Sequence, residues 1–295
     1  MNNVHWSRIK EQGGMTGLRL SWWCYKLLGR KLCYLLAYPV AAYYYFFCGS
    51  ARSASKEYLQ HIVVRTHTKP LSSLKHFISF AQNIVDKMAA WCHDIPLNRI
   101  YMPNQALFKE ILATNRGGII LTAHIGNIDV ARSLCRLIPE IKIHALMSKS
   151  HAIKFKSFLK RINASSIADI IYLEDINLET ACLISDKIER GEFIVIAADR
   201  TSPTQPKKNV TVHFLNESIH LPQGPFVLAK ILNCPSYFMG CVRENNDFKI
   251  YFNKMESGDD IQKRAQNYAL TIEDLCLRYP LQWFNFFDFF RLEGK

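Results

Sequence analysis

"GGIILTAHIGNIDVARSLCRLI", residues 117–138, places an apolar strand directly before a helix. The strand is expected over 117–123 and the helix over 127–138, because Asn127 is a preferred residue type at a helix N-terminus. His124 stands at the junction of the two elements. In open α/β sheets, ligands bind where a strand's carboxyl end meets the start of the next helix, so a site is expected at His124.

The segments on both sides continue this alternation of strands and helices. They predict an α/β fold with a mainly parallel sheet flanked by helices. The further strands are expected at 141–146, 169–173, 192–198, 236–242 and 248–252. The helices are expected at 71–92, 103–114, 150–162, 177–190 and 260–278, with a short one entered through Gly224 and Pro225. Residues 199–218 are expected to form a long polar loop.

The N-terminal part of the chain is basic and aromatic. The chain has 295 residues and a net charge of +12, and most of the surplus lies in the first 100 residues. Residues 32–51 carry no charge and are rich in Tyr and Phe, although Pro39 interrupts them. We expect residues 1–65 to form a membrane-anchoring helical segment that lies in or dips into one leaflet, and 66–295 to form the globular domain. A true membrane span and a buried helical hairpin are the alternatives.

His124 and Asp129 form a His-x4-Asp pattern at the expected site. Asp129 in the first helical turn could accept the Nδ1 proton of the imidazole, which would leave Nε2 free to act as a general base. Gly126 would allow close backbone approach, and N–H groups at the helix start could stabilise an oxyanion. The alternative is structural, with His124 ending a strand and Asp129 favouring a helix N-terminus.

Several other chemistries lack sequence support. No GxSxG elbow is present and no cysteine adjoins His124, which disfavours a covalent acyl-enzyme. Glycines 117 and 118 precede the strand and no GxGxxG occurs, which disfavours a dinucleotide site. The nine cysteines form no CxxC pair, so neither a disulfide framework nor a zinc site is expected.

Three stretches together carry a family resemblance: "AHIGNIDV" (123–130), "AADRTSP" (197–203) and "LPQGPFVLAKILNCPSYFM" (221–239). With them the chain resembles the bacterial lysophospholipid acyltransferase superfamily. It is most similar to the late acyltransferases of lipid A biosynthesis, in the divergent branch found in aryl polyene and similar lipid gene clusters. The family often has His-(Phe/Leu)-Gly-Asn-Trp-Glu, whereas this chain has Ile128 and Asp129 at the last two positions.

The resemblance implies a glycerolipid acyltransferase-like fold and a role for each matching residue. His124 would be the general base, Asp129 its orienting partner, and Gly126 and Asn127 would shape the turn between them. Further substrate-binding residues would be Lys149 and His151, as cations for a phosphate or carrier, and Asp199 and Arg200, at the acceptor site.

The implied reaction moves an acyl group from a thioester on acyl carrier protein, or coenzyme A, to a hydroxyl of a membrane lipid or lipid A-like glycolipid, without metal or redox cofactor. The implied location is the cytoplasmic face of the bacterial inner membrane. A lipid aminoacyltransferase on the same fold is one alternative. A non-catalytic basic protein that binds nucleic acid is another, disfavoured because the chain has no nucleic-acid-binding motif and its basic part is strongly aromatic.

Overall fold

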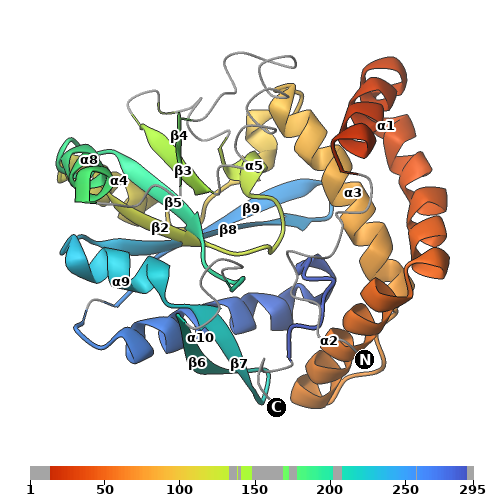
Figure 1. Ribbon diagram of the computed structural model, residues 1–295. Helices are drawn as coiled ribbons and strands as arrows, with labels where there is room; N and C mark the ends of the chain where they lie inside the picture. The colour runs from red at the N-terminus through yellow and green to blue at the C-terminus, as the bar shows by residue number, and fades with distance from the viewer. Residues whose placement is uncertain are drawn as a thin grey trace.

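A seven-stranded sheet lies at the centre of the molecule, in the strand order β1-β9-β8-β2-β5-β3-β4 (Figure 1). The computed structural model describes residues 14–132, 138, 141–147, 169–172, 178–201, 208–256 and 258–290. The sheet strands are β1 (Ile100–Tyr101), β2 (Gly118–Thr122), β3 (Ile143–Met147), β4 (Asp169–Tyr172), β5 (Phe193–Ala197), β8 (Ser236–Glu244) and β9 (Asp247–Lys254).

The sheet is mostly parallel, which confirms the α/β prediction. β2 pairs parallel with both β5 and β8, and β3 pairs parallel with β4 and β5. Only the β8–β9 hairpin is antiparallel within this sheet as described. The carboxyl ends of β2 and its two neighbours therefore meet at one edge, where His124 was expected.

Helices cover both faces of the sheet (Figure 1). They are α1 (Gly14–Phe47), α2 (Gly49–Thr66), α3 (Ser73–Trp91), α4 (Gln105–Ala113), α5 (Ile128–Ala131), α8 (Leu178–Glu189), α9 (Gly224–Ile231) and α10 (Ile261–Arg278), with 3₁₀ turns η2 (Leu97–Arg99) and η5 (Pro280–Gln282). The helix expected at 150–162 lies outside the described residues, and of the helix expected at 127–138 the structure describes only the start.

Strand β2 is buried on both sides. Ile119 and Leu121 belong to a core formed with α2, α8, α9 and α10. Ile120 points the other way, into a core formed with α1, α3, α4 and α5. Burying each such side chain contributes about 1.5–3 kcal/mol, so the strand is a well-anchored base for the residues that follow it.

The prediction of a long loop at 199–218 is wrong for the second half of that stretch, which the structure describes from residue 208. Strands β6 (Asn209–Phe214) and β7 (Glu217–Pro222) form an antiparallel hairpin there. Val210, Val212 and Phe214 are buried at alternate positions. Leu215 and Asn216 both have positive φ, 50° and 66°, as a two-residue type I′ turn requires.

The N-terminal segment forms a bent helix pair that packs on the rest of the molecule. Helix α1 continues through Pro39, and its non-helical residue is Gly29 (φ 72°, ψ 173°). Tyr25 of α1 and Tyr58 of α2 each join one of the two cores. Within the described residues no single helix combines the length and hydropathy of a membrane span; the pair α1 and α2, bent by 99°, meets both criteria together by length and composition.

Candidate functional site

His124 and Asp199 face each other because two neighbouring strands end in register. Thr122 at the end of β2 pairs with Ala197 at the end of β5, and each side chain follows its strand by two residues. His124 Nδ1 lies 2.8 Å from Asp199 Oδ1, and the His124 backbone N–H donates to Asp199 Oδ2 at 2.9 Å. One carboxylate thus holds both the ring and the backbone of the histidine.

This contact determines the protonation pattern of the pair. Burial raises the pKa of Asp199, but His124 and Arg200 outweigh it, so the net pKa is far below the usual value and the group is a carboxylate. Nδ1 of His124 must then carry the proton, which leaves Nε2 as a free acceptor. Burial and Arg200 lower the pKa of His124, so the ring is neutral near pH 7. Its side chain is 37% exposed, while that of Asp199 is 1% exposed.

Two further side chains fix the carboxylate. Asn285 donates from Nδ2 to Asp199 Oδ2 at 2.9 Å and accepts from Arg200 Nε at 2.8 Å. Arg200 also donates to the Phe284 carbonyl at 3.2 Å. Asp199 and Arg200 therefore lie at the site, as expected. Asn285 was not foreseen, since nothing in the local sequence links it to residues 85 and 86 positions earlier.

Asp129 does not take the Nδ1 proton of His124, because Asp199 occupies that position. The Trp91 indole N–H donates to Asp129 Oδ1 at 2.9 Å, and the Lys87 ammonium lies 3.2 Å from Oδ2. Arg132 is 3.3 Å from Oδ1. Burial raises the pKa of Asp129, but Lys87 and Arg132 outweigh it and keep the carboxyl ionised. The expected His124–Asp129 pairing is therefore wrong. Asp129 instead binds the cations Lys87 and Arg132.

The turn between His124 and α5 is fixed through its backbone. Gly126 has φ +59°, and a Cβ there would lie 1.9 Å from the Cys241 carbonyl oxygen. Its N–H donates to the Gln282 carbonyl at 2.7 Å, and the Asn127 N–H donates to Cys241 O at 2.6 Å. The close approach expected at Gly126 is confirmed. Asn127 stands at the N-cap of α5, but its side chain donates to the Asn83 carbonyl of α3 instead of capping.

A short stretch of chain, residues 282–285, runs along the far side of this turn and is called the 282–285 segment below. The Phe284 N–H donates to the His124 carbonyl at 2.8 Å, and Ile125 pairs with Trp283 as an isolated antiparallel bridge. Trp283 and Phe284 are buried. The C-terminal aromatics thus pack as core beside the site.

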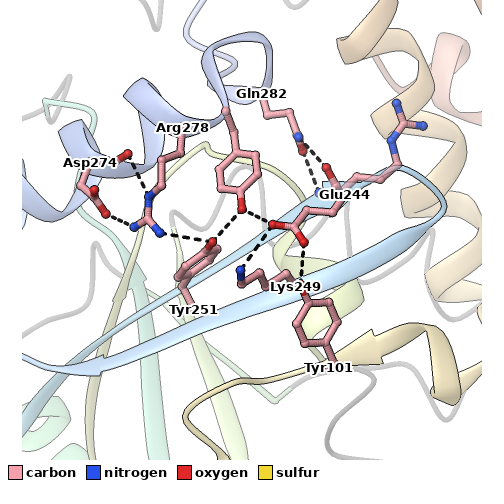
Figure 2. Close-up of polar contacts among 9 residues, drawn as sticks. Tyr101, Glu244, Lys249, Tyr251, Asp274, Arg278 and Gln282 are labelled. Atoms are coloured by element: carbon pink, nitrogen blue, oxygen red, sulfur yellow. Dashed lines mark hydrogen bonds and ion pairs between the residues drawn. The ribbon is translucent and has the colours of Figure 1, made fainter. Parts of the chain in front are cut away.

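A polar cluster on the β8–β9 hairpin anchors the start of this segment (Figure 2). Glu244 accepts from Tyr101 at 2.5 Å and from Tyr279, whose hydroxyl is 2.7 Å from that of Tyr251. Beside it, Gln282 accepts from the Arg243 N–H and donates to the Arg243 carbonyl, both at 2.8 Å. The cluster therefore positions Gln282, whose own carbonyl accepts the Gly126 N–H.

His76 of α3 anchors the middle of the same segment. Its Nε2 lies 2.9 Å from the Trp283 carbonyl, and its Nδ1 lies 3.0 Å from Ser55 Oγ, which accepts from Ser73 at 2.8 Å. The carbonyl can only accept, so Nε2 carries the proton and Nδ1 accepts from Ser55. His76 is 1% exposed, and this burial lowers its pKa from 6.5 to about 4.

Stability should therefore fall with acidification below pH 6.5. The folded-state pKa of His76 lies below the unfolded value, so its contribution is complete above pH 6.5 and is lost as the pH falls towards 4. Between pH 7.5 and 5.0 we expect a loss of about 2 kcal/mol from this group. Urea unfolding at both pH values measures it. In His76→Asn, which keeps a donor and an acceptor without titrating, the fall should be smaller by that amount; an equal fall would contradict the assignment.

Lys149 and His151 are outside the described residues, so their place relative to His124 remains a prediction. No disulfide bond joins the eight cysteines in the described part of the chain. Within that same part, no group of three His, Cys, Asp or Glu side chains is arranged to hold a metal ion.

Comparison with protein-family models and with curated proteins finds no match. The resemblance to lysophospholipid acyltransferases therefore stays an expectation.

Proposed function

We propose that this protein is an acyltransferase that moves an acyl group from a thioester, on acyl carrier protein or coenzyme A, to a hydroxyl of a membrane lipid or glycolipid. The observation that carries the proposal is the His124–Asp199 pair. A buried carboxylate on Nδ1 leaves a neutral, solvent-reaching imidazole with Nε2 as its acceptor, which is the arrangement of a general base.

The surroundings of His124 favour direct transfer over a covalent intermediate. Among the described residues, the side-chain hydrogen bond of His124 goes to Asp199, and no Ser or Cys is bonded to the ring. The proton that Nε2 takes must then come from a substrate. A lipid hydroxyl is a suitable source because its deprotonation creates the nucleophile.

In the proposed step, Nε2 of His124 removes the proton of the acceptor hydroxyl while its oxygen bonds to the thioester carbon. The carbonyl π electrons move to the carbonyl oxygen. When the tetrahedral intermediate collapses, the C=O bond re-forms, the C–S bond breaks and the thiolate leaves with the proton from His124. Asp199 stabilises the imidazolium that exists between the two proton transfers.

The outer face of α1 supports a membrane-bound acceptor. It exposes large apolar and aromatic side chains along its whole length: Leu20, Trp23, Leu27, Leu28, Leu32, Leu35, Leu36, Tyr38, Val40, Tyr43, Phe46 and Phe47. Exposed apolar surface of this extent is typical of a protein or lipid interface. The basic charge of the first 100 residues and the Trp and Tyr content favour an anionic membrane surface. We therefore propose that α1 lies in one leaflet, on the cytoplasmic face of the inner membrane.

Purified protein tests the proposal directly. Incubation with acyl carrier protein loaded with a radiolabelled fatty acyl thioester, and with vesicles of total bacterial lipid, should release free thiol and yield a labelled lipid in equal amounts. Omitting the vesicles should leave only slow hydrolysis. Glycyl-loaded carrier as a second donor separates acyl from aminoacyl transfer. Absence of labelled lipid with every donor would refute the proposal.

A further inference from the structure

One face of α3 lines the His124 turn over several helical turns. His76, Asn83 and Lys87 are seven and four residues apart, a spacing that puts them on the same side of a helix. His76 reaches the Trp283 carbonyl, and the Asn83 carbonyl accepts from Asn127 at 3.2 Å. Lys87 lies one turn beyond Asn83, and so faces the start of α5.

Lys87 is held there by two neighbours. Its ammonium lies 3.2 Å from Asp129 and 5.4 Å from the centre of the Trp91 ring. Trp91 in turn donates to the same Asp129 carboxylate. The Lys87 side chain is 34% exposed while that of Asp129 is 8% exposed, so a buried carboxylate and an aromatic ring hold a cation that still reaches solvent.

The proposed transfer creates a negative charge that needs such a cation. The oxyanion forms on the thioester carbonyl when the acceptor hydroxyl attacks. The N–H groups at the start of α5 were expected to stabilise it, but those of Gly126 and Asn127 already donate to the carbonyls of Gln282 and Cys241.

We propose, resting on the acyl-transfer function above, that Lys87 is a further catalytic residue whose ammonium stabilises the oxyanion of the tetrahedral intermediate. Asp129 is then the residue that positions Lys87. The aspartate of the His-x4-Asp pattern acts on the cation of the site instead of on the imidazole. Two different residues therefore serve the two needs of the reaction. Lys87 stabilises the negative charge of the oxyanion, and His124 takes the proton of the acceptor hydroxyl.

The electrostatics of the site agree with this arrangement. Burial is the largest cause of the low pKa of His124, Arg200 is the second, and Lys87 also lowers it. The positive charge of Lys87 is thus felt at the imidazole. Among the described residues, the other charged groups that face this region are Asp199, Asp129 and Arg132. With His124 neutral, the charges of these three groups and of Lys87 and Arg200 sum to one net positive charge. Such a site is suited to stabilising one negative charge.

Lys87→Met tests the proposal, with Lys75→Met as its matched control. Lys75 is an exposed lysine on the same helix, near its N-terminus. Asp129 keeps Trp91 and Arg132 as partners in Lys87→Met, so the variant should fold, which circular dichroism checks. We expect kcat for thiol release from fatty acyl carrier protein, with lipid vesicles as acceptor, to fall about 10²-fold while KM for the donor is unchanged. Lys87→Arg, which keeps the charge, should recover most of the loss.

A second readout does not depend on turnover. The pKa of His124, followed by NMR titration, should rise in Lys87→Met and stay unchanged in Lys75→Met. An unchanged His124 pKa in Lys87→Met would overturn the placement of Lys87 beside the imidazole. If wild type is active and Lys87→Met has the same kcat, the catalytic role of Lys87 is overturned while the acyl-transfer function stands. A wild-type protein that releases no thiol would refute the proposed function, and the catalytic role of Lys87 would fall with it.

Discussion

Asp199→Asn should reduce acyl transfer about 10³- to 10⁴-fold, nearly as far as His124→Ala. An asparagine amide at this position presents an N–H to Nδ1, so the imidazole would switch to the tautomer with its proton on Nε2. In that form the ring cannot accept a proton from the acceptor hydroxyl. The geometry would be retained, because the amide oxygen can still accept from the His124 backbone N–H and from Asn285 Nδ2.

Asp129→Asn is the comparison that shows which of the two aspartates serves His124. Asp129 contacts Lys87, Trp91 and Arg132, so we expect its loss to weaken the site less than loss of Asp199 does. The double variant His124→Ala with Asp199→Asn should be no slower than His124→Ala alone, because the two residues act as one unit. Steady-state kinetics at pH 7.5 measures all four proteins. If Asp199→Asn kept wild-type turnover while Asp129→Asn lost it, the pairing seen here would not be the working one.

Gly126→Ala should destabilise the fold by about 3 kcal/mol or more. The left-handed φ of +59° costs an L-residue about 1–2 kcal/mol. The added Cβ would also lie 1.9 Å from the Cys241 carbonyl oxygen, which forces the turn away from β8 at a further cost of about 1–3 kcal/mol. The Asn127 N–H would lose its bond to the same carbonyl. Activity should fall with stability, since this turn carries His124.

Gly17→Ala is the matched control for this substitution. Gly17 lies in α1, and a Cβ there would meet nothing within 4 Å. Thermal unfolding should show a fall of several degrees for Gly126→Ala and no fall for Gly17→Ala, in which the helix should gain slightly. Equal melting temperatures for wild type and Gly126→Ala would mean that the turn can rearrange without cost.

Most of the central sheet was predictable because its buried strands are apolar runs that can be recognised in the sequence. The run around Ile119–Leu121 is continuously apolar, as expected for a strand covered on both faces. The β6–β7 hairpin was missed because polar residues interrupt its strands, although the alternation of Val210, Val212 and Phe214 was a usable signal.

The site was predictable only in part. His124, Gly126, Asp199 and Arg200 follow strands or stand at a turn, positions that a sequence reveals. The partner of His124 depends on which strands are neighbours, and spacing along the chain cannot show that β5 lies beside β2.

The site around His124 joins parts of the chain that are remote from one another. The contact between His76 and Trp283 spans 207 positions, Asn285 to Asp199 spans 86, and His124 to Asp199 spans 75. Contacts of such sequence separation form slowly, since long loops must close first. A partly folded copy thus contains the histidine without its orienting carboxylate. If the proposed acyl transfer is the activity, the capacity to consume thioester arises only with completed folding, and immature chains leave the thioester donor intact.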